Sequence, residues 1–139
     1  MSLSIRNQLP GTVLSIARGE AMATVRARLS GGGQITAAVT LEAVRELGLA
    51  EGSEIRALVK STEVALATGQ VSGLSIRNQL PGTVSSVTTG EAMATVKVSL
   101  ESGDLTAAVT KDAVDELGLT SGTRVTALIK STEIALATA

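Results

Sequence analysis

Apolar and polar residues alternate along much of the chain, and this pattern predicts β-strands. From Ala21 to Leu29, small or apolar residues alternate with threonine and arginine, which is typical of a strand with one face toward solvent. Stretches of β-forming residues predict further strands over residues 4–9, 12–16, 35–39, 54–60 and 64–67. We expect Pro10-Gly11 to form a turn between the first two, because proline presets its own dihedral angle and glycine permits a reversal.

One segment has the features of a helix. Thr40 is a suitable N-cap, Glu42 lies in the first turn, and Gly48 would end the helix. The same pattern returns over residues 110–118. Each occurrence predicts one short helix among strands.

The whole pattern occurs twice. The decapeptide at 4–13 returns unchanged at 75–84, and 41 of the 60 positions that align between the two halves are identical. We therefore divide the chain into a first domain at 1–68, a linker at 69–73 and a second domain at 74–139. About five short strands with one helix inserted late is the element count of a small OB-type barrel. The expected fold is all-β, with two tandem five-stranded barrels of the OB-fold type and one short helix in each.

Composition removes several functions from consideration. The chain contains no aromatic residue, cysteine or histidine, which excludes a disulfide, a thiolate or imidazole metal site, a Ser-His-Asp triad and a cysteine nucleophile. No segment resembles a signal peptide or a membrane span, and the net charge of −1 provides no general attraction to nucleic acid or membrane. We expect a cytoplasmic protein that is not an enzyme, has no catalytic cofactor or direct cation ligands, and has neither nucleic acid nor membrane as a partner.

Two basic positions stand out when the halves are compared. Among the basic residues of the first half, Arg6 and Lys60 are the ones with identical counterparts, which are Arg77 and Lys130. Ser4 lies two residues before Arg6, so on an extended strand the two side chains would share one face. Guanidinium, ammonium and hydroxyl donors gathered in one place suit an oxyanion.

Other repeated donors have both a functional and a structural interpretation. Thr40 and Thr110 stand at the predicted helix starts, where backbone N–H groups lack partners, and Ser61 and Ser131 follow the repeated lysines. The threonines can equally be simple helix caps, the arginines surface charges, and the Lys-Ser pairs solvated strand ends. Lys60 and its neighbour would point apart on a strand, which argues against a nucleophilic Ser-Lys dyad.

The motifs together resemble a known family. Ser-x-Arg-Asn-Gln-Leu followed by x-Gly-x-Val, and a late Lys-Ser-Thr-Glu flanked by valine or isoleucine, are similar to the Mop-like molybdate-binding domains, the molbindins, which belong to the wider TOBE group. The resemblance covers nearly the whole chain twice, as in a tandem di-Mop molbindin of the ModG type. It implies six Mop domains around a common axis, which for two domains per chain means a homotrimer.

The resemblance also implies where an anion binds. In the family, molybdate or tungstate lies between domains, so that Ser4, Arg6 and Thr40 would form one side of a site. Lys60 and Ser61 of another domain would form the other side. The matching oxyanion-binding positions of the second unit are Ser75, Arg77, Thr110, Lys130 and Ser131.

Asn7 and Asn78 match the same motif, either as ligands or as structural residues. The function that the resemblance implies is molybdenum storage and homeostasis, with molybdate or tungstate as the ligand. Two other functions stay open. One is a regulatory or structural oligomerisation module with an effector-type anion site. The other is an OB-fold nucleic-acid binder, against which the missing aromatic stacking platforms and the net charge of −1 argue.

Overall fold

The structure is a computed structural model that describes residues 2–139, and both repeats contain the same series of elements. The first repeat comprises β1 (Asn7–Arg18), β2 (Met22–Leu29), β3 (Gln34–Thr40), α1 (Leu41–Glu46), β4 (Glu54–Val59), the 3-10 turn η1 (Ser61–Glu63) and β5 (Ala65–Ala67). The second repeat comprises β6 (Asn78–Thr89), β7 (Met93–Leu100), β8 (Gly103–Thr110), α2 (Lys111–Leu117), β9 (Arg124–Ile129), η2 (Ser131–Glu133) and β10 (Ala135–Thr138).

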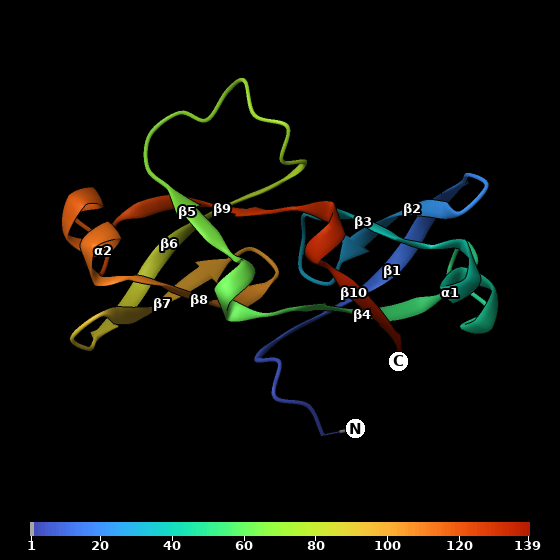
Figure 1. Cartoon of the computed structure of the whole chain (residues 1–139), viewed down its shortest axis with the longest axis horizontal. Helices are drawn as coiled ribbons and strands as arrows, with labels where there is room; N and C mark the ends of the chain where they lie inside the picture. The colour runs from blue at the N-terminus through green and yellow to red at the C-terminus, as the bar shows by residue number, and fades with distance from the viewer. Residues whose placement is uncertain (1) are drawn as a thin grey trace.

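The strands form two curled antiparallel sheets of five strands each. Their orders are β10-β4-β1-β2-β3 and β5-β9-β6-β7-β8. In Figure 1 the two sheets lie side by side along the long axis of the molecule, with α1 and α2 at opposite ends. The edge strands β3 and β10 approach one another, as do β5 and β8, so each sheet curls toward a barrel. The expected all-β fold with two OB-like units is confirmed.

Strand β2 forms as its residue pattern predicts. Ala23, Val25, Ala27 and Leu29 are buried, whereas the residues between them are exposed. Because successive side chains of a strand point to opposite faces, the apolar set covers the core and the polar set meets solvent. Strand β7 repeats the alternation over most of its length.

The turn expected at Pro10-Gly11 is wrong, because β1 continues through both residues. Along this strand the pairing changes: residues up to Thr12 pair with β4, and residues from Gly11 onward pair with β2. A Cβ atom on Gly11 would lie 2.6 Å from the carbonyl oxygen of Arg28, which is closer than real side chains approach. The glycine therefore permits a close approach of β1 to its neighbour β2 and makes no reversal.

The two helices begin as predicted. The hydroxyl oxygen of Thr40 accepts a hydrogen bond from the backbone N–H of Ala43 at 3.1 Å, and Thr110 accepts one from Ala113 at 3.1 Å. Gly118 ends α2 in the left-handed conformation, with φ of 63°, where glycine has no steric penalty. Within residues 2–139, no helix has the length and apolarity that a membrane crossing would require.

The last strand of each repeat completes the sheet of the other repeat, which the sequence pattern did not predict. Strand β5 pairs with β9, and β10 pairs with β4. Figure 1 shows both strands crossing between the two halves of the molecule. Each sheet therefore takes four strands from one repeat and one from the other. The domain boundaries at 68 and 74 mark the repeats in the sequence and stay a prediction.

Two asparagine side chains fasten the repeats to each other. Asn78 is 3% exposed; its Oδ1 accepts from the N–H of Thr36 at 2.7 Å, and its Nδ2 donates to the carbonyl of Thr36 at 2.9 Å. Asn7 makes the equivalent pair of bonds with Thr106, both at 2.8 Å. Asn78 also donates to the carbonyl of Ile129 at 3.0 Å. Each asparagine side chain thus adds a pair of hydrogen bonds between the two sheets.

One apolar core is shared by the two repeats, and the second repeat also has a smaller cluster of its own. One cluster of buried residues contains Leu9, Val25 and Ile55 from the first repeat together with Leu105 and Ile129 from the second. Because burial of apolar surface is the main favourable term in folding, neither repeat can keep this core when the two are separated.

We predict that Asn78→Ala lowers the free energy of unfolding by about 2–4 kcal/mol, because it removes three hydrogen bonds and leaves part-buried backbone groups of Thr36 unpaired. Asn7→Ala should cost less, since Asn7 makes two such bonds. Urea denaturation monitored by circular dichroism measures both changes. The control is Gln70→Ala in the exposed linker, and an equal effect in the control and in Asn78→Ala would contradict the proposed role.

Candidate functional site

A short arch precedes the first strand of each repeat. In the second repeat, the guanidinium of Arg77 donates from Nε to the carbonyl of Ser75 at 3.1 Å and from Nη2 to the carbonyl of Leu74 at 2.7 Å. The side-chain amide of Gln79 donates to the carbonyl of Ile76 at 3.0 Å. Three consecutive carbonyls are thereby held by side-chain donors. We call residues 74–77 the second arch.

The first repeat has the same arrangement at residues 3–6, the first arch. Arg6 donates to the carbonyls of Ser4 at 3.1 Å and Leu3 at 2.8 Å, and Gln8 donates to Ile5 at 3.1 Å. The expectation that Ser4 and Arg6 lie on a strand is wrong, since β1 begins at residue 7. Arginine satisfies the carbonyls of the arch, so this backbone does not need a neighbouring strand.

The second arch borders a cavity of about 270 Å³ that gathers four of the predicted site residues. Its lining consists of Ser75, Ile76, Arg77, Lys130, Ser131 and Thr132. The strand register explains why these residues meet. Asn78 pairs with Ile129 as the outermost pair between β6 and β9, so Arg77 and Lys130 leave the sheet at the same end.

Ser131 contributes a buried hydroxyl without a hydrogen-bond partner. Its Oγ is buried and unpaired within residues 2–139, and the same holds for Ser61 in the first repeat. Ser131 begins η2, which packs against β3 of the other repeat, so the strand exchange is what buries it. A buried hydroxyl without a partner costs about 1–3 kcal/mol, and both of these hydroxyls are free to donate a hydrogen bond to a ligand.

The first repeat places its lysine at an equivalent position. Asn7 pairs with Val59 at the end of the ladder, so Arg6 and Lys60 also leave the sheet together. Lys60 lines a cavity of about 150 Å³ with Ile5 of its own repeat. The opposite wall is formed by residues 132–135 of the second repeat. Lys60 therefore stands between the two repeats.

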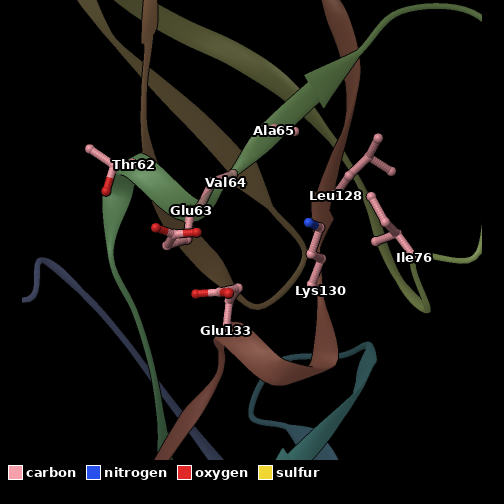
Figure 2. A pocket seen from close by; sticks show the side chains of 8 residues that line it. All are labelled: Thr62, Glu63, Val64, Ala65, Ile76, Leu128, Lys130 and Glu133. Carbon is pink, nitrogen blue, oxygen red and sulfur yellow. The ribbon is translucent and has the colours of Figure 1, made fainter.

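Lys130 borders a corresponding cavity of about 200 Å³, which is drawn in Figure 2. Glu63 and Glu133 lie on one side of this cavity, and the amino group of Lys130 points toward Leu128 on the other side. The salt bridge found within residues 2–139 joins Lys111 to its helical neighbour and does not involve Lys130. The lysine charge is therefore not neutralised by a carboxylate contact.

The threonine hydroxyls lie elsewhere in the chain. Thr110 lines a separate cavity of about 440 Å³ with Glu91, Ala92, Lys111 and Asp112, and its oxygen already accepts the capping hydrogen bond. Within one chain it does not share a cavity with the arch. That Thr40 and Thr110 meet the same anion as the arginines stays a prediction, which requires a second chain.

Asn7 and Asn78 have few hydrogen-bonding groups left for a ligand. The oxygen and nitrogen of each side chain bond to backbone groups of the other repeat, and both residues are 3% exposed. Of the two interpretations that the sequence left open, the contacts support the structural one.

Sequence reasoning missed Gln79 and Thr132. Thr132 adds a hydroxyl to the cavity lining, and Gln79 holds the arch. The available signal for Gln79 was its place in the unchanged decapeptide, which contains an equivalent Gln8. Nothing in the sequence distinguishes the role of Thr132 from that of a turn residue.

The lining of this cavity has the chemistry that suits an anion. Arg77 and Lys130 supply two positive charges, the hydroxyls supply donors, and no carboxylate lines the cavity beside the arch. Two of the five N–H donors of Arg77 are used within the arch, which leaves the others for a ligand. No group of three or more acidic residues that could hold a metal ion occurs in the described part of the chain.

Comparison with known proteins agrees with this chemistry. A model of the TOBE domain matches residues 3–66 and 74–136. A crystal structure of the cytoplasmic molybdate-binding protein ModG with molybdate bound superimposes with a TM-score of 0.97, with 42% sequence identity and full coverage of both chains.

Curated relatives include longer and shorter proteins. The molybdenum-pterin-binding protein MopB of Rhodobacter capsulatus is 40% identical over 96% of this chain and 50% of its own length. The molybdenum transport protein ModE of Herbaspirillum seropedicae is 37% identical over 99% of this chain and 52% of its own length. Molybdenum-pterin-binding protein 2 of Clostridium pasteurianum is 46% identical over 48% of this chain and 97% of its own length. The chain thus spans about half the length of the longer relatives.

These matches confirm the resemblance that the repeated motifs indicated, because the family model covers both repeats and the ModG structure covers the whole chain. The chain belongs to the TOBE-domain family and carries two TOBE domains of the Mop type in tandem.

Proposed function

We propose that this protein binds molybdate, and tungstate in the same way, and that it stores molybdenum in the cytoplasm. The observation that carries the proposal is the pair of buried, partnerless hydroxyls of Ser61 and Ser131. Each follows a lysine that leaves the sheet beside an arginine of the arch.

The charge balance supports a dianion. A tetrahedral oxyanion that loses part of its water needs donors on its oxygens and about two compensating positive charges, since an unpaired buried charge is costly. Arg77 and Lys130 supply those charges, while Ser75, Ser131 and Thr132 supply hydroxyl donors. Phosphate still carries a proton near neutral pH, and a lining without carboxylates offers no strong acceptor for it.

The relatives support the same ligand. The ModG structure contains molybdate, and the curated relatives are named as molybdenum-pterin-binding or molybdenum transport proteins. We propose that this chain likewise binds molybdate, is located in the cytoplasm and has no enzymatic activity. We also propose 1–68 and 74–139 as its two binding domains, joined by the linker at 69–73.

A second candidate function is an effector module of a regulator, with the anion as its signal. It is favoured by the match of this chain to about half of the longer ModE protein. A storage protein should bind several anions per oligomer. A regulatory effector module should bind few anions per oligomer and signal their presence to the rest of the regulator. The stoichiometry of the titration described next separates the two.

Titration calorimetry tests the ligand. We expect molybdate and tungstate to bind at micromolar concentrations or below, and sulfate and phosphate to bind more weakly. Arg77→Ala should lower the affinity of its site about tenfold to a hundredfold, the usual worth of a charged hydrogen bond. Arg124→Ala removes an exposed arginine from the same sheet and should leave affinity unchanged. If molybdate does not bind to the unmodified protein, the proposed function is wrong.

Ser131→Ala should change stability and binding in opposite directions. Removal of the unpaired hydroxyl should raise the unfolding free energy of the ligand-free protein by about 1 kcal/mol, while the lost donor weakens molybdate binding about fivefold to tenfold. Urea denaturation and calorimetry measure the two effects. Ser72→Ala in the exposed linker is the matched control. A Ser131→Ala protein that binds molybdate as tightly as the control would argue against the hydroxyl as a ligand.

We further propose that three chains assemble into a homotrimer, in which Thr40 and Thr110 of one chain reach a site of another. Support comes from the separation of Thr110 from the arch within one chain. Sedimentation equilibrium should give about three times the 14.0 kDa chain mass. Ligand should strengthen the assembly by mass action if it bridges chains. A monomer at all concentrations, with and without molybdate, would contradict the homotrimer.

A further inference from the structure

The glutamine of the repeated decapeptide holds the arch but does not itself line the cavity beside it. Gln79 donates from Nε2 to the carbonyl of Ile76 at 3.0 Å, and Gln8 donates to Ile5 at 3.1 Å. Both glutamines are partly buried. Ile76 itself lines the cavity beside Arg77. The amide therefore acts on a peptide group at the edge of the anion site.

The direction of that peptide group matters for an anion. A carbonyl oxygen carries partial negative charge and repels an oxyanion, whereas an N–H group attracts it. In a planar trans peptide the C=O and the following N–H point in opposite directions. When Gln79 holds the Ile76 carbonyl, the N–H of Arg77 is turned away from the glutamine. Arg77 holds the two preceding carbonyls, so together the two side chains orient the whole arch.

We propose that Gln79 and Gln8 are positioning residues of the oxyanion sites. They hold the carbonyls of Ile76 and Ile5 away from the anion and set the direction of the arch N–H groups. This inference rests on the proposed function, because it assigns a role within the same site. It also explains why glutamine recurs in a decapeptide whose serine and arginine already supply the ligand groups.

The repeats differ in how the glutamine is supported. Arg56 donates from Nη1 to the side-chain oxygen of Gln8 at 3.5 Å, a long hydrogen bond that adds a weak contact to the amide. The counterpart of Arg56 is Thr126, and it makes no such bond to Gln79 within residues 2–139. The second site should therefore depend more strongly on its glutamine alone.

Selective isotope labelling isolates the peptide group in question. With ¹³C′-isoleucine and ¹⁵N-arginine, HNCO spectra report Ile-Arg peptides, which in this chain are Ile5-Arg6, Ile55-Arg56 and Ile76-Arg77. The Ile55-Arg56 peptide lies in β4, which pairs with β10 on one side and β1 on the other, and serves as an internal reference. Molybdate should shift the two arch signals and leave the reference in place.

Gln79→Met keeps the length of the side chain and removes the amide. We expect this variant to move the Ile76-Arg77 signal in the ligand-free protein and to weaken molybdate binding at one class of site about fivefold to tenfold, as for the loss of one hydrogen bond. The reference signal should not change, and the thermal midpoint should fall only slightly, as for the loss of one hydrogen bond. Gln70→Met, the same substitution in the exposed linker, should alter neither signal nor affinity.

The outcomes are separable. Unchanged affinity in Gln79→Met, with tight molybdate binding by the unmodified protein, would overturn the positioning role and leave the proposed function intact. The positioning role is also overturned if affinity falls together with the thermal midpoint while the Ile76-Arg77 signal stays in place, since the glutamine would then act through general stability. If the unmodified protein binds no molybdate, the proposed function itself is wrong, whatever the arch signals show.

Discussion

The reciprocal exchange of the last strands is the constraint on which the rest of the structure depends. Because β5 and β10 each complete the sheet of the other repeat, the chain must cross between sheets after Lys60 and again after Lys130. Those crossings are the two 3-10 turns, and each packs against an edge strand of the opposite sheet. The shared core and the asparagine hydrogen bonds between the sheets form because the strand exchange holds the two sheets close together.

The exchange also accounts for the candidate site. A serine at the start of a turn on an isolated barrel would be hydrated, but here the opposing sheet covers it. Ser61 and Ser131 are consequently buried without partners. The cavity next to Ser131 receives positive charge from Arg77 and Lys130, so burial, charge and donor geometry coincide at one point. This coincidence is the basis of the proposed anion site.

The two repeats are similar in the arch and different around it. Arg6 and Arg77 make the same pair of carbonyl contacts, whereas Arg56 contacts Gln8 and has a threonine as its counterpart. A tandem chain can vary one site without changing the other, which a protein made of identical single domains cannot do. The linker keeps both versions in one chain.

The sequence by itself determined most of the elements, because alternation and capping threonines are local properties. The alternation of β2 and the caps at Thr40 and Thr110 could be predicted in this way, whereas the role of Arg6 with Lys60 stays a prediction. Tertiary structure alone decided the strand exchange, the continuous path of β1 through Gly11, and the burial of Ser131. The last strands of the two repeats are similar, so each of them could pair with either sheet. No local pattern therefore tells whether a repeat completes its own sheet or the sheet of the other repeat. Likewise, the sequence does not tell whether a glycine permits the close approach of a neighbouring strand or makes a turn.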